Sequence, residues 1–291
     1  MPQNPSIIAS KGPSGDIQIF DYTRHSSRPT ATDENKSQPD LRLTCQSDTG
    51  YGLSWNTLQK GYLASSSGDS VVCVWDVQAG ESRDDRLDAI VKLNGHLAII
   101  EDVAWSWHNE NQLISVSDDR QILLWDIRNT AAPASAVKDA HAAEINCVAF
   151  NPVQEHIFVT GSSDNNIHVW DSRKLDTPTH TLSHHKDDVL QVAWSPFHSH
   201  VLASSSADRL VAIWDLERIG KEQSEEDAAD GPPELLFVHG GHTNRVPDVA
   251  WCPNMPWVLA SVAEDNILQI WSMTSEVYED DEDEIKDEDL E

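Results

Sequence analysis

Histidine, aspartate and tryptophan recur in this chain at one fixed spacing. His96 lies 23 residues before Asp119, and Asp119 lies six residues before Trp125. Histidine and aspartate form hydrolytic triads when a serine nucleophile joins them. An arrangement that occurs four times at identical spacing is architectural, however, so we expect no catalytic residue in it. The three further sets are His141/Asp164/Trp170, His185/Asp208/Trp214 and His242/Asp265/Trp271.

These sets belong to a longer repeated segment, which we call the frame. Each of five frames has a Trp, an Asp six residues before it, and an aromatic residue 14 positions before the Asp. Nine positions further back, four frames have the His, whereas the first frame has Gln46. The segments between frames, which we call joints, vary in length. Rigid repeats with joints of variable length are typical of stacked structural units. The first frame has Asp69 and Trp75, and the aromatic residues are Trp55, Trp105, Phe150, Trp194 and Trp251.

The residue types within each frame predict three short strands. Residues 71–75 (VVCVW) and 201–205 (VLASS) are β-rich or small-residue runs, and the frame's Asp lies in the turn between two such runs. A fourth strand from the following joint would complete a four-stranded sheet. Four frames end in Trp-Asp, and this pair and the repeat length resemble the blades of WD-repeat proteins.

The resemblance to WD-repeat proteins implies an all-β fold, a WD-repeat β-propeller with five complete blades and part of a sixth. It also implies that each His reaches the turn Asp, and that a strand Ser and the Trp indole complete a buried hydrogen-bond network. The frame with Gln46 departs from the pattern, so we expect a weaker network there.

Outside the frames, residues 1–23 resemble the second half of another blade, with Phe20-Asp21 in place of Trp-Asp. Residues 24–40 predict a loop, and 41–277 hold the five blades with an acidic loop at 219–236. Residues 278–291 contain ten acidic residues and one Lys, which predicts a disordered tail.

The composition limits the function. There are 49 acidic against 20 basic residues, a formal charge of −29, which argues against direct nucleic-acid binding and favours basic partners. No apolar run is long enough to cross a membrane. The four cysteines are scattered, so we expect reduced thiols, no metal site and no cofactor. The chain has no phosphate-binding Gly loop or nucleophile elbow, so we do not expect an enzyme.

Several segments resemble one particular WD-repeat family, the histone-binding chaperones of the retinoblastoma-binding type. These segments are MPQNP at residue 1, GYGLSW at 50, DGPPELLF at 230 and SVAEDNILQIW at 261. The resemblance implies a nuclear scaffold for histones H3 and H4 in chromatin assembly, remodelling, histone deacetylase (NuRD), Polycomb and acetyltransferase complexes. That family has seven blades after a long N-terminal helix; by comparison this chain lacks the helix, the first blade and part of the second.

Two histone sites follow from the resemblance. A side groove for an H4 helix would have an acidic wall of Glu226, Asp227 and Asp230 and an apolar floor of Phe237, Val238 and Val277, while its opposite wall, the family's helix, is missing. A second site, at the top of the channel, would hold the H3 tail or corepressor tails. Its residues would be Tyr51, Glu101, Asn146, Asp188 and Glu264; Thr49 and Leu190 depart from the family's acid and aromatic residue.

Two alternatives remain open from the sequence. Trp-Asp-x-Arg at blade ends resembles the substrate receptors of cullin ubiquitin ligases, and this chain has it twice, ending at Arg128 and Arg173. The alternative without a binding function is that both arginines simply lie at the surface ends of strands. The other alternative is a truncated fragment that has lost its function.

Overall fold

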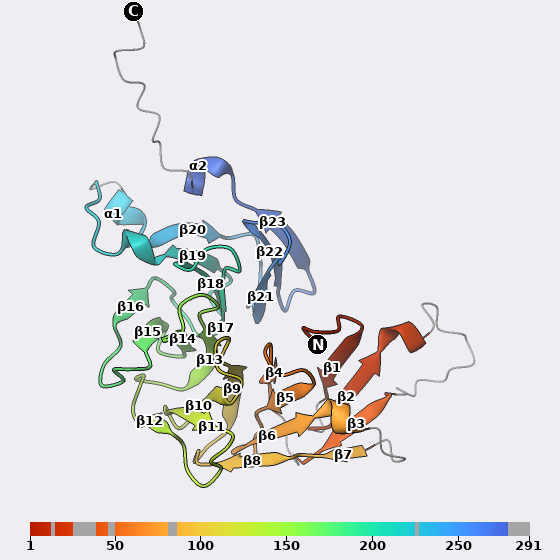
Figure 1. Cartoon of the computed structure of the whole chain (residues 1–291). Coiled ribbons are helices and arrows are strands. Elements are labelled where there is room, and N and C mark those ends of the chain that lie inside the picture. Colours follow the sequence, from red (N-terminus) through yellow and green to blue (C-terminus); the bar gives the residue numbers. More distant parts are fainter. Residues whose placement is uncertain (13–14, 26–38, 46–49, 81–85, 225–226, 279–291) are drawn as a thin grey trace, which may run out of the picture. The chain divides into compact units, whose positions relative to one another are not determined.

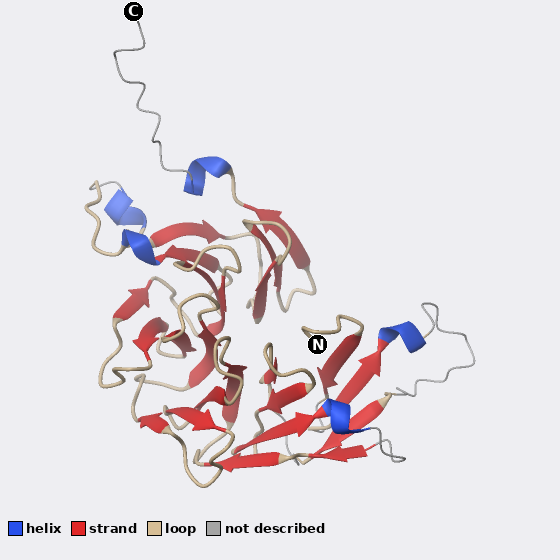
Figure 2. Ribbon diagram, in the orientation of Figure 1, coloured by secondary structure: helices blue, strands red, loops and turns tan. Residues whose placement is uncertain are grey.

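A computed structural model describes residues 1–12, 15–25, 39–45, 50–80, 86–224 and 227–278. It divides into two compact units, Met1–Thr181 and Leu182–Glu291. Strands dominate both units, and the few helices are short (Figures 1 and 2). Gln46, Thr49, Glu226 and the acidic tail from residue 279 lie outside the described residues.

The first sheet of the first unit has four strands, β1 (Ile7–Lys11), β2 (Ile17–Asp21), β3 (Leu41–Thr44) and β7 (Arg86–Asp88). Strands β1 to β3 are antiparallel, and β7 adds to β3 in parallel. We expected the partial blade to end at residue 23. Strand β3 extends it instead, because Ile17 and Ile19 of β2 pair with Leu43 and Leu41.

The first three frames form the remaining sheets of this unit, in the expected way. Each frame supplies three antiparallel strands, and the joint after it supplies the fourth. The sheet of the first frame has β4 (Leu53–Trp55), β5 (Tyr62–Ser65), β6 (Val71–Asp76) and β8 (Val91–Asn94). The sheet of the second frame has β9 (Ile100–Trp105), β10 (Gln112–Ser117), β11 (Ile122–Asp126) and β12 (Ser135–Val137). The sheet of the third frame has β13 (Ile145–Phe150), β14 (Ile157–Ser162), β15 (Asn166–Asp171) and β16 (His180–Ser183), and β16 leads the chain into the second unit.

The second unit has two sheets. The first is four-stranded, with β17 (Val189–Trp194), β18 (Val201–Ser206), β19 (Val211–Asp215) and β20 (Leu235–His239). The second has only β21 (Asp248–Trp251), β22 (Val258–Val262) and β23 (Leu268–Ser272). In the described part of the chain no fourth strand pairs with β23, so the fifth frame supplies three strands. The five four-stranded sheets are the first sheet and those of the first four frames, so the incomplete sheet is the last one rather than the first. Two single-turn helices, α1 (Asp227–Asp230) and α2 (Ser275–Tyr278), flank these sheets.

Neighbouring sheets within a unit pack face to face. In the first unit β9 contacts both β4 and β13, and in the second β17 contacts β21, so the frame's first strand is the innermost one. The faces between sheets are apolar: Ile122 and Leu124 of β11 share one core with Phe158 and Trp170 of the next sheet. Burying such large side chains is the main stabilisation available to an all-β chain.

The structure contradicts the prediction that all four cysteines are reduced thiols. Cys45 and Cys73 form a disulfide, whereas Cys147 and Cys252 are not disulfide-bonded. The pairing is possible because the end of β3 lies against β6, where Trp75 Nε1 donates a hydrogen bond to the Thr44 carbonyl (3.1 Å). The separation of the two cysteines along the chain, 28 residues, gave no sign of this contact.

Candidate functional site

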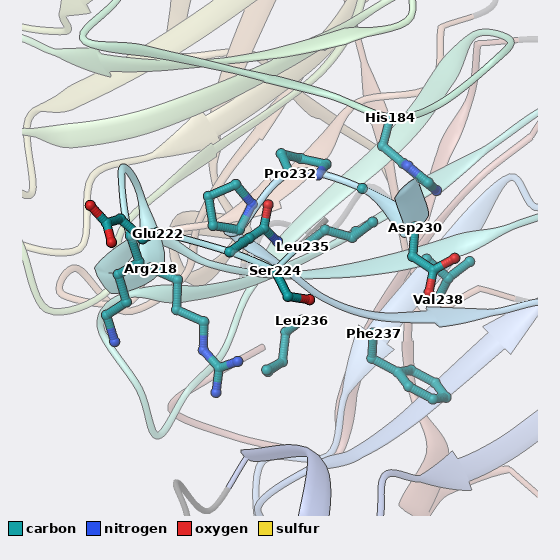
Figure 3. A pocket seen from close by; sticks show the side chains of 14 residues that line it. His184, Arg218, Glu222, Ser224, Asp230, Pro232, Leu235, Leu236, Phe237 and Val238 are labelled. Atoms are coloured by element: carbon teal, nitrogen blue, oxygen red, sulfur yellow. The ribbon is translucent and has the colours of Figure 1, made fainter. Parts of the chain in front are cut away.

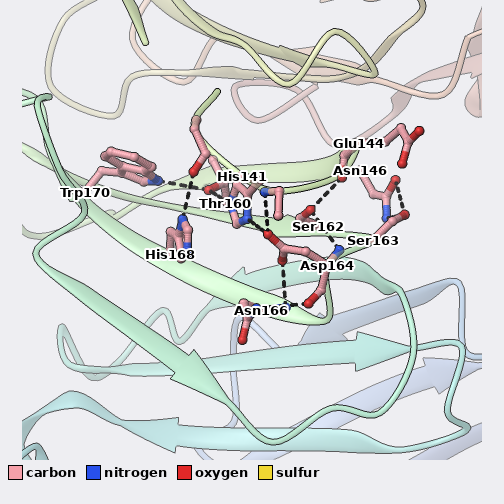
Figure 4. Close-up of polar contacts among 12 residues, drawn as sticks. His141, Glu144, Asn146, Thr160, Ser162, Ser163, Asp164, Asn166, His168 and Trp170 are labelled. Carbon is pink, nitrogen blue, oxygen red and sulfur yellow. Dashed lines mark hydrogen bonds and ion pairs between the residues drawn. The ribbon is translucent and has the colours of Figure 1, made fainter. Parts of the chain in front are cut away.

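Three frames contain the expected buried network. In the third frame the His141 Nδ1–H donates to Asp164 (3.0 Å), and Nε2 accepts from the Thr160 hydroxyl (2.7 Å). The indole of Trp170 donates to the same hydroxyl (2.9 Å; Figure 4). Every polar atom on the buried side has a partner, so the arrangement stabilises the blade and leaves no free nucleophile. His96/Asp119/Ser115/Trp125 and His185/Asp208/Ser204/Trp214 repeat it.

Trp214 belongs to one of these predicted networks and lies beside a local irregularity of its sheet. Its indole Nε1 donates to the Ser204 hydroxyl (2.8 Å), so Trp214 is linked to His185 through that hydroxyl, and its single N–H leaves none for Asp208. The register between β19 and β20 shifts just before Trp214, which pairs with Leu235 across an irregularity. The side chain of Trp214 is fully buried. Trp214 therefore has a structural role and presents no surface to a ligand.

The carboxylates of these networks stay ionised. Burial disfavours the charge on Asp208, but hydrogen bonds from His185 and from the N–H groups of Lys186 and Leu210 lower its pKa to about 2. A proton donor at neutral pH needs a raised pKa, so these aspartates are poor general acids.

The last frame departs from the pattern. His242 Nε2 bonds to Ser261 (2.7 Å) and Trp271 donates to Ser261 (3.1 Å), but His242 Nδ1 has no partner. Asp265 accepts from Thr243 instead (3.1 and 2.8 Å). The expected His242/Asp265 bond is therefore wrong. In the first frame, Gln46 lies outside the described residues, and Trp75 bonds to backbone rather than to a strand hydroxyl.

Three predicted H3-tail residues lie in the first unit at equivalent positions. Tyr51 precedes β4, Glu101 is the second residue of β9, and Asn146 is the second residue of β13. Tyr51 is 81% exposed, and Asn146 donates a hydrogen bond to Ser163 (3.1 Å; Figure 4). Because the frame's first strands lie side by side in this unit, these residues share one end of the sheets.

Glu101 has the electrostatics of a site for cations. Burial and the nearby charge of Asp118 raise its pKa to about 7. Burial and the charges of Glu144 and Asp119 raise the pKa of Asp118 in turn. Carboxylates that repel one another at a half-buried position gain most from an approaching Lys or Arg, which relieves the repulsion.

The other two predicted H3-tail residues lie in the second unit. Asp188 precedes β17, and its carboxylate is 3.6 Å from Arg245 Nη2. Glu264 is exposed, and its N–H donates to the Arg245 carbonyl (3.0 Å). Arg245 is a cation that was not foreseen from the sequence, and it would compete for Asp188.

A groove of about 800 Å³ lies in the second unit, between the loop after β19 and strand β20 (Figure 3). Asp230, Phe237 and Val238 line it, as predicted for the H4 groove. Pro232 and Pro233 shape its wall, and Leu235 and Leu236 extend the apolar surface. The sequence DGPPELLFV thus supplies an acid, a rigid turn and an apolar strand to one surface.

The structure qualifies the rest of the H4 prediction. Val277 packs with Leu236 and Phe237 in the core of the second unit rather than lining the groove. Glu226 and the side chain of Asp227 lie outside the described residues. Further residues that were not foreseen also line the groove, among them His184, the basic Arg218 and Lys221, and the acidic Glu222. The two basic residues of RIGK at 218–221 could have revealed that the loop has mixed charge.

The two Trp-Asp-x-Arg arginines have the same local structure. Arg128 forms a two-pronged ion pair with Asp126 (2.6 Å), and Arg173 forms one with Asp171 (2.6 Å). Both guanidinium groups are largely exposed. Each arginine thus lies at the surface end of a strand and pairs with the Asp of its own Trp-Asp, as the interpretation without a binding function predicts.

The model of the WD domain, G-beta repeat, matches residues 88–126, 135–171, 176–215 and 233–272, which together make up more than half of the sequence. The chain belongs to the WD-repeat family. Each match ends at the Trp-Asp or Trp-Ser of a frame and covers its His, Asp and Trp. In the first three matches these residues form the complete network, whereas the fourth covers the frame without the His242–Asp265 bond. WD repeats are typical of non-catalytic scaffolds for protein interactions, and the all-β WD-repeat β-propeller class is confirmed.

Among the residues that the structure describes, neither a metal-binding cluster nor a membrane-spanning helix is found. Within the described residues, no three His, Cys, Asp or Glu side chains are arranged to hold a metal ion. No helix in that part of the chain is both long and apolar enough to span a bilayer.

Proposed function

We propose that this WD-repeat protein is a non-catalytic nuclear scaffold that binds basic segments of histones H3 and H4 within chromatin complexes. The observation that carries the proposal is the groove of the second unit. An amphipathic helix binds where an apolar floor meets polar groups at the rim, and Leu235 to Val238 with Asp230 provide both. The first helix of H4, with an apolar face and basic residues, fits this chemistry.

The charges along the groove set the strength of binding. Asp230 and Glu222 attract a basic helix, whereas Arg218 and Lys221 repel it. Arg218 is held by Asp215 at 3.2 Å, so its charge is partly offset. Lys221 is exposed, which leaves it as the main repulsive residue among the described ones. This arrangement favours moderate affinity that substitutions can move in either direction.

Glu101 and its acidic neighbours support the second half of the proposal. A basic H3 tail would place Lys or Arg near Glu101, while Tyr51 offers an exposed aromatic face. Such a contact explains why an acid lies at the second position of β9, a strand whose other positions are mostly apolar.

The test of the groove is fluorescence anisotropy with a labelled peptide of the first H4 helix. Asp230→Lys should weaken binding roughly ten-fold, about 1.4 kcal/mol, and Lys221→Glu should strengthen it. Both side chains are exposed, so folding should be unaffected. Equal affinities for the wild type and both variants would exclude this groove as the H4 site.

Arg128→Ala serves as a matched control for the ligase alternative. Arg128 lies outside the groove and outside the Glu101 site, so histone peptides should bind this variant as they bind the wild type. Selective loss of a cullin-ligase adaptor on the same substitution would favour the receptor function instead.

A further inference from the structure

Core packing fixes a glycine just before the His of the second frame. A Cβ atom on Gly95 would lie 2.8 Å from the ring of Trp125 and 3.1 Å from Leu123 Cδ1. Trp125 is fully buried, and its indole donates a hydrogen bond to Ser115 (2.8 Å), so the ring cannot move aside without loss of that bond. Any larger residue in place of Gly95 would therefore disturb the core between the sheets of the first two frames.

The residue before this glycine is an exposed asparagine. Asn94 is the last residue of β8, which is the outermost strand of its sheet, and it pairs with Val71 at the very end of the ladder. In the described part of the chain the Gly95 N–H donates no hydrogen bond. Local opening costs least at such a strand end, so the Asn94 side chain and the Gly95 nitrogen can approach one another.

The other frames show that the architecture does not need asparagine at this position. Both Thr44 and Ser183 end a strand two positions before the frame's Gln or the frame's His, as Asn94 does. The remaining two frames have Asp139 and Gly240 there. Asn94-Gly95 is the only Asn-Gly pair in the sequence. The pair thus joins a glycine that packing requires to an asparagine that packing does not require.

We propose that Asn94 is a deamidation site of the folded chain. The Gly95 nitrogen, after losing its proton to hydroxide, attacks the Asn94 side-chain carbonyl carbon Cγ. The new N–Cγ bond forms, the Cγ–Nδ2 bond breaks, and Nδ2 leaves as ammonia with a proton from water, which gives a cyclic succinimide. Water then opens this ring at either carbonyl, to aspartate or to isoaspartate. Glycine favours the attack because it has no Cβ to shield its nitrogen and rotates freely.

The isoaspartate product changes the path of the main chain. Its backbone runs through the former side chain, which adds one carbon atom between β8 and His96. His96 is buried and held on both sides, by Asp119 (3.0 Å) and by Ser115 (2.8 Å). The extra length must displace either His96 or Gly95 beside Trp125. The isoaspartate form should therefore unfold at a lower urea concentration, whereas the aspartate product keeps the backbone and should unfold like the unmodified chain.

Peptide mapping by mass spectrometry tests the proposal on the purified chain, held at mildly alkaline pH and physiological temperature. We expect the folded protein to convert Asn94 to aspartate and isoaspartate at least several-fold faster than any other asparagine. The same chain unfolded in urea is the reference, because the Asn-Gly pair has no structural protection there. An Asn94 amide that stays intact in the folded chain but reacts in the unfolded chain would overturn the proposal.

Two variants separate the modification from its effect on stability. Asn94→Ser places at this position the residue that the fourth frame has as Ser183, so it should fold, form no product and keep its urea midpoint throughout the incubation. The midpoint of the wild type should fall as isoaspartate accumulates. Freshly prepared Asn94→Asp carries the charge of the products on a normal backbone and should match the unmodified wild type. If it is as unstable as the isoaspartate form, the argument from backbone length is wrong.

Discussion

At the scale of single residues, one hydroxyl group joins the two largest members of each complete network. Ser115 donates to His96 Nε2 (2.8 Å) and accepts from Trp125 Nε1 (2.8 Å), and both partners are buried. Ser115→Ala should lower the free energy of unfolding by about 1–3 kcal/mol for each group left unpaired. Ser261→Ala should cost less, because Trp271 is only half-buried and water can replace the lost bond. Urea denaturation measures both, and equal losses would contradict this ranking.

The raised pKa of Glu101 predicts a dependence of stability on pH. Its pKa is about 7 in the folded chain against a usual 4.5, so the folded state binds this proton more tightly than the unfolded chain. The stability from this group is therefore present at low pH and is lost as pH rises from 4.5 through 7. Glu101→Gln should become more stable relative to the wild type over that interval. Thermal melting across the interval checks this, and a constant difference would exclude the assignment.

At the scale of elements, a contact between two positions joins the start of a frame to the frame's last strand. The residue before the frame's His lies near the residue two before its Trp. In the third frame His168 Nδ1 bonds to the Ala140 carbonyl (3.0 Å), and in the fifth Gln269 donates to the Gly241 carbonyl (2.8 Å). In the first frame these positions are Cys45 and Cys73, so the disulfide takes the place of a hydrogen bond where the His is replaced.

The disulfide should therefore stabilise the junction between the first sheet and β6. Cys45→Ser should lower the free energy of unfolding by about 2–4 kcal/mol under non-reducing conditions. A reductant should destabilise the wild type and leave Cys45→Ser unchanged. Cys252→Ser, which removes a free cysteine, should keep the sensitivity to reductant. Insensitivity of the wild type would mean that the disulfide does not contribute.

The frame made much of this architecture predictable, because its residues are those that must be buried or hydrogen-bonded. Strand order, the aromatic core and three of the four networks follow from spacing. The His242/Asp265 bond is absent in the one frame where the residue after the His, Thr243, adds a hydroxyl donor to the Asp; the other frames have only a backbone N–H donor at that position. The disulfide, β7 and the register shift at Trp214 could not be foreseen, since all three depend on joints of irregular length. Asp230, Phe237 and Val238 were foreseen from the resemblance as lining the groove, but Val277 does not line it, and Arg218 and Lys221 were not foreseen.

At the scale of the whole molecule, the excess of acidic residues should govern the binding of basic partners. The formal charge of −29 produces a field that attracts basic segments, and salt screens it. Affinity for an H3 tail peptide should therefore fall steadily as salt rises. An affinity independent of salt would mean that apolar contacts dominate the binding.

The central claim is that the chain binds basic histone segments through its acidic positions. Its most direct test is anisotropy with a labelled H3 tail peptide at low salt, comparing the wild type with Glu101→Gln and with Glu110→Gln. Each variant replaces one carboxyl group by an amide, but Glu110 lies in the exposed turn before β10, away from the predicted site. We expect the peptide to bind the wild type and Glu110→Gln alike and to bind Glu101→Gln at least several-fold more weakly. Absence of binding to the folded wild type, or equal weakening by both substitutions, would contradict the claim.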